Sequence, residues 1–120
     1  MAHKRTVHVR RVYDAPAQTD GTRVLVDRIW PRGMTKEKAH LDEWCKQVAP
    51  SAALRKWYIR NPDRFAEFSD RYQVELQDPE RAEALVHLRD LSEGRTLTLL
   101  TATKHPEISK AEVLAELLRS

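Results

Sequence analysis

Three short segments of the chain have the hydrophobic pattern of β-strands. In residues 6–12 (TVHVRRV), valines alternate with polar residues until the phase shifts at Val12, which predicts a strand near a sheet edge, with room for a bulge. Residues 22–29 (TRVLVDRI) contain consecutive apolar residues, typical of a strand buried on both faces in a parallel sheet. Residues 95–102 (RTLTLLTA) mix β-branched residues with leucines, which predicts a third strand.

Five further segments have the apolar spacing of amphipathic helices, each introduced by a start signal. We expect the first helix over residues 36–48, with Thr35 as its N-cap and an apolar face that includes Cys45. The signals before the other four are Ser51, Asn61-Pro62, Asp78-Pro79 and a capping box of Ser109 and Glu112. The predicted order is β-β-α-α-α-α-β-α. This order indicates an α/β fold, with one compact domain over residues 1–120 and a small, mainly parallel sheet flanked by helices.

Composition narrows the function classes. Hydrophobic residues make up 41% and charged residues 32% of the 120 residues, a balance typical of a globular chain. No apolar run approaches the roughly 20 residues of a membrane span, and the N-terminus has no apolar signal segment. The single cysteine cannot form an internal disulfide, which fits a reducing compartment, so we expect a cytoplasmic protein. Three glycines are too few for a glycine-rich nucleotide loop.

Candidate chemistry gathers where two of the predicted strands end. Asp27, Arg28, Trp30 and Arg32 follow the second strand, and Lys104 follows the third. Ligand sites in open parallel sheets lie at the carboxyl ends of the strands, and the helix after Thr35 would direct free N–H groups there. Because arginine binds phosphate or carboxylate through two hydrogen bonds, these residues predict a site for an anion.

The same residues also fit a purely structural network. In that interpretation Asp27 pairs with Arg28, Arg32 or Arg11 and fixes the turn, without any ligand. Trp30 could stack on a ligand ring, although packing against the sheet is the simpler interpretation. His105 could act as an acid or base, although an exposed loop residue is the simpler interpretation. Both interpretations of the cluster remain open at this point.

Neither catalytic residues nor a cofactor can be assigned from the pattern. The histidines lack metal-ligand spacing, so we expect no metal site. The favoured function is binding of a small anionic or phosphorylated ligand, and whether the protein is also an enzyme is left open. The alternative is a non-catalytic interaction protein that binds nucleic acid or a protein partner. A net charge of +3 and a pI of about 9.2 allow nucleic-acid binding, although no nucleic-acid motif is present.

The segments DG-RVLVDR-WPRG, APS--LRKW and RY--EL, together with TLLTATKHP, resemble the YeaO-like short branch of the domain-of-unknown-function 488 family. The resemblance covers nearly the whole chain. It implies an α/β fold in which the ends of the second and third strands face one cleft. A longer branch carries a Cys-His-Arg motif where this chain reads EISKAEV, so that motif is absent here. Two positions differ from the usual pattern: His105 replaces an acidic residue, and Cys45 replaces a leucine, which suggests core filling.

Overall fold

The computed structural model describes residues 5–120 and contains a four-stranded sheet in which all pairs are parallel. The strands are β1 (Thr6–Arg11), β2 (Thr22–Leu25), β3 (Glu43–Trp44) and β4 (Thr96–Thr101). Their order across the sheet is β1-β4-β2-β3, so β1 is an edge strand, as predicted. The central strands β4 and β2 are buried, as expected for β2 from its consecutive apolar residues.

Five α-helices complete the α/β fold. They are α1 (Lys36–Ala39), α2 (Ala52–Arg60), α3 (Phe65–Glu75), α4 (Pro79–Leu91) and α5 (Lys110–Arg119). The predicted order of elements is confirmed, with the short strand β3 as an addition between α1 and α2. Among residues 5–120, none of these helices combines the length and the apolarity needed to cross a membrane.

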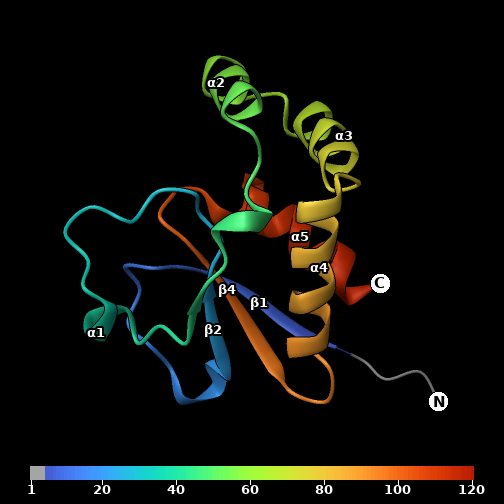
Figure 1. Cartoon of the computed structure of the whole chain (residues 1–120). Coiled ribbons are helices and arrows are strands. Elements are labelled where there is room, and N and C mark those ends of the chain that lie inside the picture. The colour runs from blue at the N-terminus through green and yellow to red at the C-terminus, as the bar shows by residue number, and fades with distance from the viewer. Residues whose placement is uncertain (1–4) are drawn as a thin grey trace.

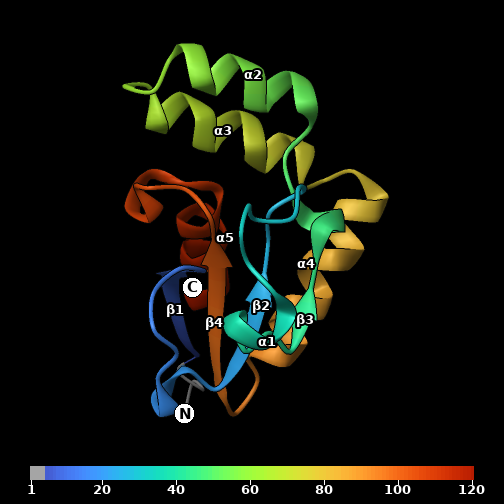
Figure 2. The ribbon, with the colours of Figure 1, turned by 90° about the vertical axis from the view of Figure 1, so that its left-hand side faces the viewer.

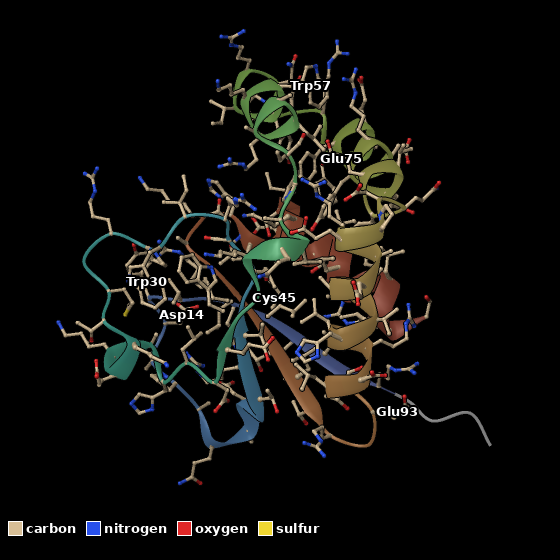
Figure 3. The ribbon with its side chains drawn as sticks, in the orientation of Figure 1. Asp14, Trp30, Cys45, Trp57, Glu75 and Glu93 are labelled. Carbon is tan, nitrogen blue, oxygen red and sulfur yellow. The ribbon has the colours of Figure 1, made fainter. Side chains whose placement is uncertain are left out.

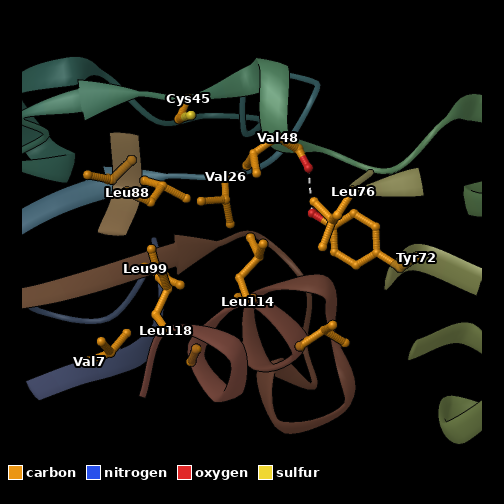
Figure 4. Packing of buried hydrophobic residues seen from close by; sticks show 14 of the residues in the cluster. Val7, Val26, Cys45, Val48, Tyr72, Leu76, Leu88, Leu99, Leu114 and Leu118 are labelled. Atoms are coloured by element: carbon orange, nitrogen blue, oxygen red, sulfur yellow. Dashed lines mark hydrogen bonds between the residues drawn. The ribbon is translucent and has the colours of Figure 1, made fainter. Parts of the chain in front are cut away.

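The two faces of the sheet are covered differently. Figure 1 shows α4 and α5 on the side of the sheet opposite α1 and its long loop. The helical side holds the larger core, in which Val26 and Leu99 meet Leu114 of α5 (Figure 4). Tyr72 of α3 is fully buried in this core, and its hydroxyl donates a hydrogen bond to the Val48 carbonyl. Burial raises the pKa of the Tyr72 hydroxyl far above its usual value, so the group remains a neutral donor.

The single helix predicted over residues 36–48 is wrong. The helix stops at Ala39, since His40 takes a left-handed conformation with φ 48°, and the chain then extends into β3. Hydrogen bonds to β2 explain the change, because the Cys45 N–H donates to the Leu25 carbonyl at 2.8 Å. β3 thereby pairs with an edge of β2 that a helix would leave without partners.

The apolar spacing in this segment has another cause. Leu41 and Trp44 pack on the α1 side of the sheet, whereas Cys45 and Val48 pack on the helical side. The four side chains therefore serve two different cores and do not form one helical stripe.

A second correction concerns the start of α3. The helix begins at Phe65, and Pro62 lies in the turn before it. Asn61 instead closes α2, because its side-chain amide donates to the Trp57 carbonyl at 2.8 Å. Three other start signals are confirmed: Pro79 opens α4, and the hydroxyls of Ser51 and Ser109 accept hydrogen bonds from the first turns of α2 and α5. The capping box predicted for α5 is wrong in its second half, because the Ser109 N–H donates to the Pro106 carbonyl and the Glu112 carboxylate pairs with Arg119.

Candidate functional site

The carboxyl ends of β2 and β4 face the α2–α3 hairpin, which lies across that end of the sheet (Figure 2). A cavity of about 410 Å³ lies there and is referred to as the cationic cavity. Its polar and aromatic lining comes from Tyr13, Asp27, Arg28, Trp30, Arg32, Arg55 and Lys110. Four of the five residues predicted from the sequence therefore line one cavity, at the edge of the sheet where they were expected.

Asp27 is held firmly at the base of the cavity. Its side chain is 12% exposed and lies 2.9 Å from the Lys110 ammonium. It also accepts hydrogen bonds from the Thr101 hydroxyl at 2.7 Å and from the Ala102 N–H at 2.8 Å. The carboxylate thus joins the end of β2 to the end of β4 and to α5, which compensates for its burial. The expected pairing of Asp27 with an arginine is wrong, because the partner is Lys110.

Arg11 is also occupied by contacts within the protein. Its Nε donates to the Thr103 carbonyl at 2.9 Å, and its guanidinium lies 5.1 Å from the ring centroid of Tyr13. The Tyr13 hydroxyl in turn donates to the Arg32 carbonyl at 2.8 Å. These contacts tie the loop after β2 to the loop after β4, so Arg11 has a structural role at the rim.

Three arginines are available for a ligand. In the part of the chain that the structure describes, Arg28, Arg32 and Arg55 have neither a side-chain hydrogen bond nor an ion pair. Arg28 and Arg32 are exposed, whereas Arg55 of α2 is partly buried. The Nε atom of Arg55 is inaccessible to solvent and has no hydrogen-bond partner. Leaving such an N–H without an acceptor costs free energy, and the Nε of Arg5 is in the same condition.

Trp30 lies on the loop that joins β2 to α1 (Figure 3). Its indole N–H donates to the Met34 carbonyl at 2.7 Å, and its ring meets Trp44 edge-on, with centroids 5.2 Å apart. These contacts agree with the packing interpretation of this residue. The ring nevertheless forms part of the wall of the cationic cavity.

Lys104 does not line the cavity. It is exposed and follows β4 at the same end of the sheet, while Lys110 provides the lysine that faces the arginines. The neighbouring His105 is also exposed and lies 3.6 Å from the Glu107 carboxylate. The structure therefore brings Asp27, Arg28, Trp30 and Arg32 together and leaves Lys104 apart from them.

Arg55 and Lys110 are the site residues that the sequence interpretation missed. Arg55 lies within the segment LRKW, which carried part of the family resemblance, but its distance in sequence from β2 hid its position. Lys110 is the first residue of α5. A cation is unfavourable at a helix N-terminus, so its presence there was a signal that a carboxylate compensates it.

The chemistry of a nucleophile or a metal is not visible at this site. No group of three potential metal ligands occurs among residues 5–120. Cys45 is buried outside the cationic cavity, and burial raises the pKa of its thiol to about 11, so it is protonated at neutral pH. What the cavity offers is four cationic side chains, one of them neutralised by Asp27.

Comparison with known proteins gives matches over almost the full chain. Residues 6–120 match a family model described as the inactive DUF488-N3 subclade. The chain is 49% identical over 118 residues to uncharacterised proteins of Mycobacterium tuberculosis and Mycobacterium bovis, which covers 98% of each partner. It is 41% identical over 114 residues to the uncharacterised protein YeaO of Escherichia coli, covering 95% of this chain and 97% of that relative. No solved structure matches the chain.

Proposed function

This chain belongs to the DUF488 family, in the branch described as the inactive DUF488-N3 subclade, and we propose that it binds a small anionic or phosphorylated ligand without turning it over. The ligand occupies the cationic cavity at the carboxyl ends of β2 and β4. The observation that carries the proposal is the buried Nε of Arg55, which has no hydrogen-bond partner within the described chain.

An anion supplies what Arg55 lacks. A buried polar group without a partner costs about 1–3 kcal/mol, and more when it is charged. After a rotation of the Arg55 side chain that turns Nε toward the cavity, one phosphate or carboxylate oxygen accepts from Nε while a second oxygen accepts from a terminal nitrogen of the same guanidinium. The ligand therefore removes the penalty of the unpaired Nε–H group, which favours the bound state.

The other charges support the same occupant. Asp27 neutralises Lys110 at 2.9 Å, so the net positive charge of the cavity resides on Arg28, Arg32 and Arg55. Arg28 and Arg32 are exposed at the rim and keep the freedom to turn toward an incoming anion. Their planar forks suit phosphate better than a lysine ammonium does. The cationic rim also raises the local concentration of anions and speeds their association.

Binding without turnover is supported by the chemistry that surrounds the cavity. Its titratable residues are an ion-paired aspartate and lysine, three arginines and Tyr13, whose hydroxyl already donates to a backbone carbonyl. Such a set clamps an anion but offers neither an activated nucleophile nor a free general base. The family description as inactive agrees with a binding role.

The test compares two arginines of the same helix. Inorganic phosphate is titrated calorimetrically into the wild type, Arg55→Gln and Arg60→Gln. Arg60 is exposed at the end of α2 and does not line the cationic cavity, so it is the matched control. Loss of a charged hydrogen bond weakens phosphate binding at least about tenfold in Arg55→Gln, whereas Arg60→Gln binds as the wild type does.

Equal affinity in the two variants would contradict the proposal. A protein that ignores phosphate but binds an oligonucleotide, with affinity that falls steeply as salt rises, would favour the interaction function instead.

A further inference from the structure

A second cavity of about 340 Å³ adjoins the cationic cavity and is referred to as the apolar cavity. Its apolar lining consists of Pro50, Tyr58, Ile59, Pro62, Phe68 and Ile108. Arg55 and Lys110 line both cavities, so the two spaces meet at these side chains. An anion on Arg55 is therefore within reach of an apolar surface.

The walls of the apolar cavity are fixed by contacts between distant segments. The rings of Tyr58 and Phe68 stack with centroids 4.2 Å apart and planes 13° from parallel, which joins α2 to α3. The Tyr58 hydroxyl donates to the Ile108 carbonyl at 2.7 Å, which joins α2 to the segment before α5. The cavity is thus preorganised and does not depend on a loop closing over it.

Its size and composition suit a ring. An apolar cavity of about 150 Å³ in another protein binds benzene, so the space here is large enough for an aromatic group. Ile59 and Ile108 leave 78% and 36% of their surface exposed at the rim. Exposed apolar side chains beside a concave apolar wall mark a surface that an apolar ligand group covers favourably, because the apolar area is then removed from water.

We infer that the ligand is an aromatic organic anion, in which a phosphate or similar group is joined directly to a ring. The anionic group accepts from Arg55 in the cationic cavity, and the ring lies in the apolar cavity between Tyr58, Ile59 and Ile108. Arginine suits the junction because its aliphatic stem contacts the ring while its guanidinium holds the anion. This inference rests on the proposed anion-binding function and adds the class of the ligand.

The affinity of phenyl phosphate relative to inorganic phosphate tests the inference. Both are titrated into the wild-type chain, with phenol as the neutral ring alone. Burial of the ring gives phenyl phosphate at least about tenfold higher affinity than inorganic phosphate, while phenol binds more weakly than either. Equal affinities for the two phosphates would overturn the inference and leave the anion site in place. Failure of both phosphates to bind would overturn the proposed function as well.

A matched pair of variants locates the ring. Ile59→Asn makes the apolar wall polar without adding charge, and Val86→Asn makes the same kind of change on an exposed helical position of α4, away from both cavities. Ile59→Asn weakens phenyl phosphate binding at least about threefold and leaves inorganic phosphate binding unchanged. Val86→Asn changes neither affinity. If the two variants have the same effect on phenyl phosphate, the placement of the ring is wrong.

Discussion

Replacing Asp27 with asparagine separates the structural role of the carboxylate from ligand binding. The variant keeps an oxygen that can accept from Thr101 or Ala102, but it loses the charged partner of Lys110. The Lys110 side chain is 15% exposed, so water compensates only part of the loss. A hydrogen bond to a charged group contributes about 1.5–3 kcal/mol, and we expect Asp27→Asn to lower the free energy of unfolding by about 2 kcal/mol. For a chain of this length that lowers Tm by roughly 6–10 °C.

The same change strengthens anion binding. Asp27 is the anionic residue among those that line the cationic cavity, and its removal leaves the charge of Lys110 uncompensated. One unit charge at about 4 Å in a water-like dielectric contributes about 1 kcal/mol, which corresponds to roughly fivefold tighter phosphate binding. Stability and affinity therefore change in opposite directions, a result that general unfolding of the variant cannot produce.

Urea denaturation followed by circular dichroism measures the stability change, and calorimetry on the folded variant measures the affinity. Asp70→Asn, at an exposed position of α3, is the control and leaves both quantities unchanged. The double variant Asp27→Asn/Lys110→Met loses less stability than the two single changes predict together, because the two residues interact directly. Wild-type stability combined with weaker phosphate binding in Asp27→Asn would refute the reasoning, since the carboxyl group would then belong to the ligand site.

Three further predictions concern residues outside the cavity. Burial by itself would raise the pKa of Asp20, but a backbone N–H and the Arg23 guanidinium hold it below its usual value. The contribution of Asp20 to stability is therefore present above its unfolded-state pKa and is lost as pH falls through its folded-state pKa. We expect Asp20→Asn to flatten the fall of Tm below about pH 4. The same fall of Tm in the variant and the wild type would contradict this prediction. Burial raises the pKa of the Cys45 thiol to about 11. Cys45 therefore reacts with a disulfide reagent at least about a hundredfold more slowly in the native protein than in denaturant. Equal reaction rates in the two conditions would contradict the burial of Cys45. Gly21→Ala lowers the free energy of unfolding by more than about 2 kcal/mol, because φ is 64° and a Cβ would collide with the β4 backbone. Gly33→Ala is the control and costs only about 1 kcal/mol, because φ is 73° but the space around it is open. Equal losses of stability in urea denaturation would contradict the collision at Gly21.

The sequence predicted three of the four strands and the position of the candidate site, because these depend on local patterns. Continuous apolar residues at Val24, Leu25 and Val26 indicate a buried parallel strand, and charged residues just after such a strand lie at its carboxyl end. Asp27 and Arg28 therefore line the predicted cavity.

The remaining features depend on contacts between distant segments. β3 is two residues long and exists because β2 offers an unpaired edge, which no pattern within residues 36–48 reveals. Arg55 reaches the cavity because the α2–α3 hairpin lies across the end of the sheet. Lys110 lines the cavity at the start of α5, where the Asp27 carboxylate compensates its positive charge. The position of Lys104 after β4 predicts a place at the site, but that position does not determine the direction of the side chain.

The most direct test of anion binding is the nuclear magnetic resonance signal of the Arg55 Nε–H group. Its cross-peak is assigned by its absence from the spectrum of Arg55→Gln, and the Nε–H of Arg23, which already donates to the Ala39 carbonyl at 3.1 Å, serves as the internal reference. Phosphate is expected to shift the Arg55 signal saturably, with the Kd found by calorimetry, while the Arg23 signal stays in place. A fixed Arg55 signal in a sample that binds phosphate would contradict it.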